Sequence, residues 1–513
     1  MLPIVCKPGE VGPFTLFQKE NAISSLDFNN GAFQFREACI EGKIEENGIA
    51  TKYFTVSGAP PRPKEKDVVW SLKSPFMTDP TFDVRSTAET LQSYISYLSA
   101  ISVYRGGFDG ILLKPHFEVT VGIDFPNAFF QQDDDTLTFG SVSGKCSFAD
   151  GDVVIHEFGH KLTYSINREM RASLDDVEGG AISEALSDAF PAIWLNDKEI
   201  GESLAVCLGI ANVPSPETAL RDIGNPQRYL FHGEEEHERT TLYAPFLWFT
   251  YQEMIQLAVG NVSKARDIMT VISANMAAYI PSSPKKADFL KAFYNSLIAF
   301  TKRPDFQTKY NFDVEAFKRI ILHQAKLAGL LEASDSEGEK YIFTLYPEIT
   351  NIAAALAGFE AQKISLQKGY ENSVQAFYQQ YFSGRPIENR GVRFIFTDNG
   401  AQIITFTADT NTMKKDIRLS AEDAWKVVIS DDTRTKLRLQ LIANLKHGLG
   451  SDREIKFLDD LMQKLKDMKM PVSSIVYLAE RTNPQYRFDI KDIITIYVDS
   501  VTGETTFSNQ AFY

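Results

Sequence analysis

The feature that most constrains this chain is residues 152–162, where a glutamate and two more residues separate two histidines. The run has the character of a helix, and positions i and i+4 of a helix share one face. His156 and His160 can therefore direct two imidazoles toward one point, with Glu157 beside it. Such a pair supplies half of a tetrahedral zinc site, and the adjacent carboxylate can take a proton from metal-activated water. A surface helix with two solvated histidines is the alternative.

A second apolar run, residues 181–190, carries two carboxylates at the same helical spacing. Glu184 and Asp188 share a face, where like charges repel each other and are costly to bury. A nearby metal ion explains both, with Glu184 as the third ligand and Asp188 as the acceptor that orients a ligating histidine. An exposed acidic face is the alternative, but apolar neighbours favour a buried helix. These neighbours are Ile182, Leu186, Phe190, Ile193 and Trp194.

Residues 156–160 and 179–188 together resemble the thermolysin-like zinc metallopeptidases. Three further segments follow in the family's order, so that the resemblance covers about residues 75–330. These segments are residues 127–130, 219–226 and 237–241. The resemblance implies an α+β fold with a two-lobed catalytic domain, in which a mixed α/β lobe precedes an all-helical lobe. The zinc ion then lies at the floor of a cleft between the lobes.

The resemblance also implies roles for single residues. Asn127 and Ala128 lie where the family's edge strand holds the substrate backbone. Arg221 matches the arginine that reaches the substrate carbonyl region. His237 matches the histidine that stabilises the tetrahedral intermediate, although His232 competes for that role.

The chain departs from the family at several positions. Ser183 stands where an asparagine usually precedes the third ligand. The gap between His160 and Glu184 is a few residues longer than usual, which leaves open the identity of the active-site tyrosine, with Tyr164 as a candidate.

A calcium site is a further expectation from the resemblance, because residues 196–202 resemble the family's calcium-binding stretch. Leu195 occupies a place where another acidic ligand is expected, and calcium needs six or more oxygens. A solvated acidic loop explains the segment equally well. The candidate calcium ligands are Asp152, Asp197, Glu199 and Glu202.

Composition limits the partners. A net charge of −14 disfavours nucleic acid, and the absence of an apolar run of about 18 residues predicts no membrane span. The expected partner is a peptide or protein substrate, and the oligomeric state stays open. Residues 1–8 lack the features of a secretory signal, whereas the resemblance implies a secreted or periplasmic protein. The four cysteines allow two disulfides or none; they are Cys6, Cys39, Cys146 and Cys207.

The chain is predicted to have four parts. They are a β-rich segment at 1–65, the catalytic lobe with the zinc helices at 66–245, a helical lobe at 246–335 and an α+β accessory module at 340–513. The catalytic lobe is expected to begin with a long helix at 83–104, followed by strands at 117–121 and 136–139.

Within the accessory module, residues 350–382 are predicted to be helical. A hairpin is expected at 392–406, where Asp-Asn-Gly forms the turn, and a helix begins with a capping box at Ser420. Strands are expected at 486–490 and 493–498. This pattern resembles the inhibitory modules in the pro-regions of secreted thermolysin-like enzymes. Those modules precede the catalytic domain, so inhibition does not carry over, and a generic accessory or binding domain fits equally well.

The predicted function is that of a zinc-dependent endopeptidase with one zinc ion per chain. Glu157 acts as general base and passes the proton to the leaving amine, while His237 and Arg221 donate hydrogen bonds to the oxyanion. An aminopeptidase-like enzyme is one alternative, for which the acidic residues 234–236 are the hint. A zinc-containing binding protein without turnover is the other. A structural zinc site fits poorly because cysteines are missing near the two helices.

Overall fold

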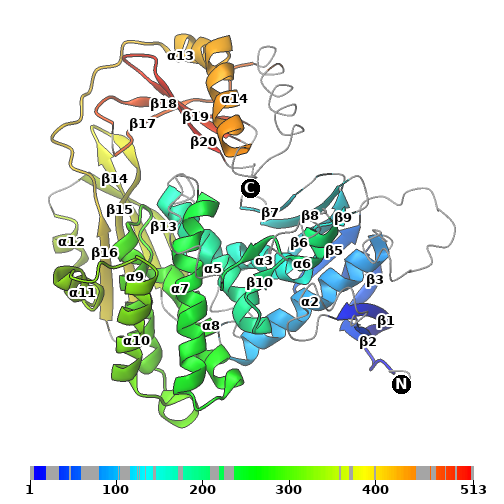
Figure 1. The fold of residues 1–513 in the computed structure, drawn as a ribbon. Coiled ribbons are helices and arrows are strands. Elements are labelled where there is room, and N and C mark those ends of the chain that lie inside the picture. Colours follow the sequence, from blue (N-terminus) through cyan, green and yellow to red (C-terminus); the bar gives the residue numbers. More distant parts are fainter. Residues whose placement is uncertain are drawn as a thin grey trace.

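The computed structural model describes residues 5–18, 34–45, 48–58, 80–101, 103, 116–123, 125, 127–132, 135–142, 146–170, 177–207, 219–224, 236–357, 360–368, 374–397, 400–445, 463, 469–479, 481–490 and 494–509. Over these residues the protein is a mixed α+β structure with several sheets, as predicted (Figure 1). Its helices include none that is both long and apolar enough to cross a membrane, within the described residues.

The N-terminal half is built on a seven-stranded sheet in the order β3-β4-β5-β6-β8-β7, with β9 paired to β8. Its strands are β3 (Lys43–Glu45), β4 (Gly48–Ala50), β5 (Phe54–Gly58), β6 (Phe117–Ile123), β7 (Ala128–Gln131), β8 (Thr136–Val142) and β9 (Cys146–Ser147). β5, β6 and β8 run parallel, which requires crossover connections such as the predicted long helix, α2 (Pro80–Ala100). Among the described strands β7 lies at the end of the order, so within this part of the chain the strand that follows Asn127 is an edge strand, as predicted.

A short hairpin precedes this sheet. β1 (Glu10–Gln18) pairs with β2 (Gln34–Glu41), and a disulfide joins Cys6 to Cys39 beside it. One of the cysteine pairings that the sequence left open is therefore present.

The two motif-bearing runs form neighbouring helices, α3 (Gly151–Ile166) and α5 (Val177–Leu195). Their close approach depends on Gly159. A Cβ atom at this position would lie 2.9 Å from Cδ2 of Phe190 and 3.0 Å from Cα of Ser187. A larger residue would force the helices apart and separate the side chains that face each other across them.

The predicted helical region follows. It contains α7 (Glu236–Leu257), α8 (Val262–Tyr279), α9 (Lys286–Thr301), a π-helical turn at Phe306–Tyr310, α10 (Val314–Leu327) and α11 (Ser336–Ile342). Between α5 and α7 lie β10 (Glu199–Ile200), α6 (Glu202–Cys207) and β11 (Arg221–Asp222). One continuous apolar core joins the seven-stranded sheet, α3, α5 and these later helices.

The prediction of helix at 350–382 was wrong. After the short β12 (Glu348–Ile349) and α12 (Ile352–Ala355), the chain forms a five-stranded antiparallel sheet in the order β12-β16-β15-β14-β13. Its long strands are β13 (Glu360–Lys368), β14 (Val374–Phe382), β15 (Arg385–Thr397) and β16 (Gly400–Phe406). β14 is rich in aromatic residues, which fit a pleated surface, and it is stabilised as a strand by its pairing with β13 and β15. The predicted β15–β16 hairpin is confirmed.

The last unit contains α13 (Ala421–Val428), α14 (Asp431–Leu445), β17 (Ser474–Val476), β18 (Gln485–Ile490), β19 (Ile494–Asp499) and β20 (Thr505–Asn509). Ser420 accepts a hydrogen bond from the Asp423 amide, which confirms the predicted cap at the start of α13. In Figure 1 the yellow sheet stands beside the green helices, and this last unit lies above it in orange and red.

Candidate metal centre

Helix α3 buries its polar residues together with its apolar ones. His156 is 3% exposed and Glu157 is 7% exposed, and the residues from Asp152 to Gly159 are all buried. The Asp150 side chain accepts a hydrogen bond from the Asp152 amide and caps the helix start. This burial rules out the alternative of a surface helix with two solvated histidines.

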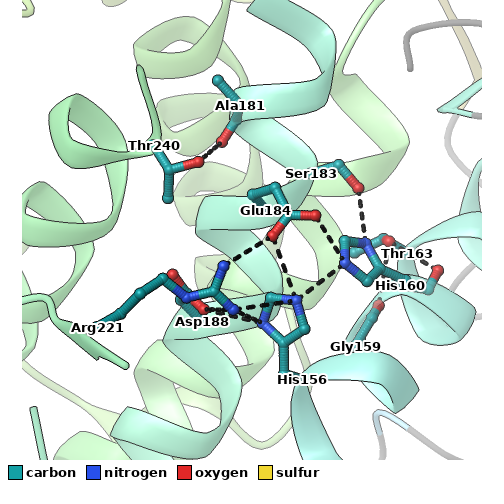
Figure 2. Close-up of polar contacts among 10 residues, drawn as sticks. All are labelled: His156, Gly159, His160, Thr163, Ala181, Ser183, Glu184, Asp188, Arg221 and Thr240. Carbon is teal, nitrogen blue, oxygen red and sulfur yellow. Dashed lines mark hydrogen bonds and ion pairs between the residues drawn. The ribbon is translucent and has the colours of Figure 1, made fainter. Parts of the chain in front are cut away.

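Three ligand atoms converge between α3 and α5 (Figure 2). The Nε2 atoms of His156 and His160 lie 3.1 Å apart. The Glu184 carboxylate lies 3.3 Å from the first of these nitrogens and 3.1 Å from the second. Ligand atoms about 2.0 to 2.1 Å from a tetrahedral zinc ion lie about 3.3 to 3.4 Å from one another. The three side chains therefore already have the mutual spacing of zinc ligands.

The other nitrogen of each imidazole has its own partner. Nδ1 of His156 lies 2.8 Å from Oδ1 of the fully buried Asp188, and Nδ1 of His160 lies 3.1 Å from Oγ of Ser183. An ionised carboxylate can only accept, so Nδ1 of His156 donates to Asp188 and a neutral ring keeps its lone pair on Nε2. That lone pair faces Glu184, and acceptors this close repel each other unless positive charge lies near both. The Arg221 guanidinium, 3.4 Å from Nε2 of His156 and 3.2 Å from Oε2 of Glu184, supplies part of that charge.

The groups around His156 also favour a positive charge on its ring, as its pKa shows. Burial and the Arg221 guanidinium lower the pKa of His156, but Glu184 and Asp188 outweigh them and raise it to about 9. A raised pKa favours a proton on this ring in the metal-free protein, in addition to the charge of Arg221. A metal ion with the same ligands would replace that proton.

Glu157 lies beside this cluster on α3. Burial raises the pKa of its carboxyl above the usual range, although the two histidines oppose the shift. A carboxylate that holds its proton more firmly than in water is a better base for accepting one during a reaction.

Arg221 enters the site from β11. Its guanidinium lies 3.2 Å from Oε2 of Glu184 and 3.0 Å from Oδ1 of Asp188. The arginine therefore holds both carboxylates in place, and it shares Asp188 with Nδ1 of His156. Its approach to a substrate carbonyl stays a prediction.

The predicted substrate strand lies next to α3. The Asn127 carbonyl accepts from the Gly140 amide at 2.9 Å, and the Asn127 side chain accepts from the Ala128 amide at 2.9 Å. The ring of Tyr164, on α3, packs 5.9 Å from that of Phe130 in β7. These contacts place β7 against α3, but substrate binding there stays a prediction.

The two candidate histidines for the oxyanion are placed less fully. His237 lies in the first turn of α7, near the start of the helix whose Thr240 hydroxyl donates to the Ala181 carbonyl of α5 (Figure 2). The side chain of His237 and all of His232 fall outside the described part of the chain.

The residues predicted to bind calcium come partly together. Oδ2 of the buried Asp152 accepts from the Gly201 amide at 3.2 Å, and Oδ1 of Asp197 accepts from the Glu199 amide at 3.1 Å. Glu202 is also buried. The described residues hold two groups of three ligand-type side chains within 4.8 Å of one another: the site above, and Cys6, Glu10 and Cys39, whose cysteines form the disulfide. Calcium binding stays a prediction.

Sequence reasoning missed two contacts around the site. The Ser183 hydroxyl orients His160 from the position directly before Glu184, and Lys161 forms a buried ion pair with Asp135. The lysine directly after the second histidine was the available signal for the second contact, since a lysine on a buried helix needs a partner.

Comparison with known proteins adds no relative: no family model matches this sequence, and no curated protein matches it.

Proposed function

We propose that this protein is a zinc-dependent endopeptidase. The observation that carries the proposal is the convergence of His156, His160 and Glu184 at mutual distances of 3.1 to 3.3 Å in a buried site. Three protein ligands of this kind are typical of catalytic zinc sites, which keep a fourth position open, whereas structural sites are usually closed by four protein ligands.

A zinc ion held by these three residues supplies Lewis-acid chemistry, because it lowers the pKa of water and polarises a carbonyl group. The chain provides the rest. Glu157 accepts the proton from the attacking water and delivers it to the nitrogen of the leaving amine as the C–N bond breaks. Asp188 holds His156 in one tautomer, and Ser183 holds the ring of His160.

The substrate lies along the edge strand. An extended peptide can add to an exposed edge through main-chain hydrogen bonds, and β7 is the terminal strand of its sheet beside α3. Arg221 and His237 donate hydrogen bonds to the oxyanion that develops on the attacked carbonyl. For Arg221 this requires that its guanidinium keep a donor for the substrate beside the two carboxylates.

The test combines metal content with cleavage of internally quenched peptides by the full chain. We expect one zinc ion per chain and a loss of cleavage after chelation. Glu157→Gln should retain zinc and lose turnover about 10²- to 10⁴-fold, because the amide cannot accept the proton. Glu337→Gln is the matched control, since this glutamate side chain is 82% exposed on α11. Wild-type turnover in Glu157→Gln would refute the general-base role.

Two other outcomes identify the alternatives. Cleavage restricted to peptides with a free amino terminus would identify an aminopeptidase-like enzyme built on the same ligands. Stoichiometric zinc without cleavage of either blocked or free peptides would identify a zinc-containing binding protein.

A further inference from the structure

A buried lysine follows directly after the second candidate metal ligand. Lys161 is completely buried, and its ammonium forms an ion pair with Asp135, whose side chain is 13% exposed. Lysine is almost never fully buried unless it is paired. The pair joins α3 to the residue directly before β8, and the two residues are 26 positions apart in the sequence.

Aromatic rings surround the ammonium. It lies 4.5 Å from the ring centre of Phe117 on β6 and 5.7 Å from that of Phe130 on β7. A cation over the face of an aromatic ring is attracted by its quadrupole. Lys161 therefore contacts β6, β7 and the start of β8 at once.

Asp135 occupies a distinctive place in the hairpin formed by β7 and β8. It has φ = 60°, in the left-handed region, and it directly precedes Thr136, which pairs with Gln131 at the end of β7. Aspartate is one of the few non-glycine residues that adopt this conformation readily. The ion pair thus fastens the end of the hairpin to α3.

Stability does not explain such a pair. Replacing a buried ion pair by apolar residues of similar volume is often neutral or stabilising, because both charges lose their hydration on burial. A buried pair does impose a defined geometry, since both charges must meet. Here the geometry relates an edge strand to the helix that carries His156 and His160.

We propose that the Lys161–Asp135 ion pair is a positioning device that fixes the edge strand β7 relative to the candidate metal ligands. The inference rests on the proposed peptidase function, in that an extended peptide on β7 is then held in register with those ligands. Lys161 is next to His160 on a helix whose packing against α5 is fixed by Gly159. A displacement of about 1 Å between substrate and catalytic groups can cost about 100-fold in rate.

The test removes the charges without leaving one of them unpaired. The single variants Lys161→Met and Asp135→Asn each leave a buried or half-buried charge or dipole without its partner and should lower the melting temperature. Asparagine is chosen at position 135 because it tolerates the left-handed backbone conformation as aspartate does. The double variant Lys161→Met/Asp135→Asn should recover most of that loss and keep one zinc ion per chain. We expect kcat/KM of the double variant to fall about 10- to 100-fold for long peptides, with a smaller loss for peptides too short to reach along β7.

Hydrogen exchange gives a readout that needs no catalysis. In the double variant the β7 amides should lose protection while the α3 amides keep theirs. Lys318→Met/Glu315→Leu on α10 is the matched control, because it removes an ion pair at the surface and should change neither readout. If the wild-type chain cleaves no peptide but β7 still loses protection, the proposed function fails and the positioning role stands. Wild-type protection of β7 in the recovered double variant would overturn the positioning role, as would unchanged kcat/KM for long peptides in an active enzyme.

Discussion

The two sheets of the C-terminal half pack on different apolar cores. The sheet β12–β16 shares the core of α3 and α5, the helices that carry the candidate metal ligands, because Ile395 and Ile404 belong to the same apolar cluster as residues of these helices. The sheet β17–β20 packs on α13 around a core of its own, which includes Trp425 and Phe488. The two sheets follow each other in the sequence but are stabilised by different cores.

Polar contacts reinforce the first attachment. The Gln375 amide donates to the carbonyl of Ile166, the last residue of α3, at 2.7 Å. The buried Arg393 donates to the carbonyls of Ala278 and Ile280 at the end of α8, where a cation complements the helix dipole. Burial lowers the pKa of Arg393 to about 10, so its charge is held there at a cost.

The described contacts of the second sheet include several to the first sheet, through β15. Ile387 of β15 bridges Tyr477 next to β17, and Arg487 of β18 lies 3.0 Å from Glu388. We therefore expect perturbations of the first sheet to reach the candidate metal centre, and perturbations of the second to stay local.

The largest contrast should come from one substitution made in each sheet. Ile395→Ala and Ile496→Ala each remove a buried isoleucine side chain and should each cost about 2 to 5 kcal/mol of local stability. The first should lower the protection of α3 amides against hydrogen exchange, because its cavity lies in the shared core. The second should lower protection in β18 and β19 and leave α3 unchanged.

Zinc content provides the control for this pair. Ile496→Ala should bind zinc as tightly as the wild type. A weakened zinc affinity in Ile496→Ala, equal to that in Ile395→Ala, would show that the two sheets unfold as one unit with the site.

Metal removal should also distinguish the two regions, because it should destabilise the first and leave the second unchanged. A ligand present at about 100 times its Kd stabilises the folded state by about 2.7 kcal/mol. Chelation should therefore lower the temperature of the calorimetric transition in which α3, α5 and the sheet β12–β16 unfold. The transition of the β17–β20 unit should keep its temperature, and movement of both transitions by the same amount would contradict the separation.

The sequence predicted those parts of the molecule that depend on local spacing. The i, i+4 pairs on α3 and α5 identified the residues that meet between the helices, and the cap at Ser420 and the β15–β16 hairpin were local signals as well. The strands β13 and β14 were mistaken for helix, because their stabilisation comes from partners such as β15. Periodicity within a short window carries no information about such pairing.

The contacts that sequence reasoning missed join distant residues. Arg393 meets Ala278 across 115 positions, and Gln375 meets Ile166 across 209. Residue type alone does not predict a buried partner for either side chain, since an arginine or glutamine in a strand is usually solvated. Burial had to be known before the need for a partner could be seen.

A smaller and strictly local effect is expected at Asp499 in the second sheet. Burial alone would raise its pKa, but hydrogen bonds from the amides of Thr502 and Val501, and from Asn483 and Gln485, outweigh burial and lower it. A lowered folded-state pKa stabilises the unit above the unfolded value of about 3.9, and this contribution is lost as the pH falls through the folded value.

Asp499→Asn should therefore remove about 1 to 3 kcal/mol at neutral pH and flatten the acid dependence of β18–β19 protection. The zinc content of the same variant at neutral pH sharpens the comparison, because we expect it to equal that of the wild type. An unaltered acid profile in the variant would contradict the role of the carboxylate.

The smallest effect should come from the contact that ties the first sheet to the metal-site helix. Gln375→Met keeps the length of the side chain and removes the donor to the Ile166 carbonyl, which should cost about 1 kcal/mol. Gln402→Met is the matched control, because this glutamine is half-buried and pairs through its backbone with Ile395 in the same sheet. If the first sheet supports α3, Gln375→Met should increase exchange at the last turn of α3 while the control leaves it unchanged. Equal exchange in both variants would mean that the shared apolar core alone attaches the sheet to the metal-site helix, because a hydrogen bond that contributes to the attachment cannot be removed without loosening the helix end that it holds.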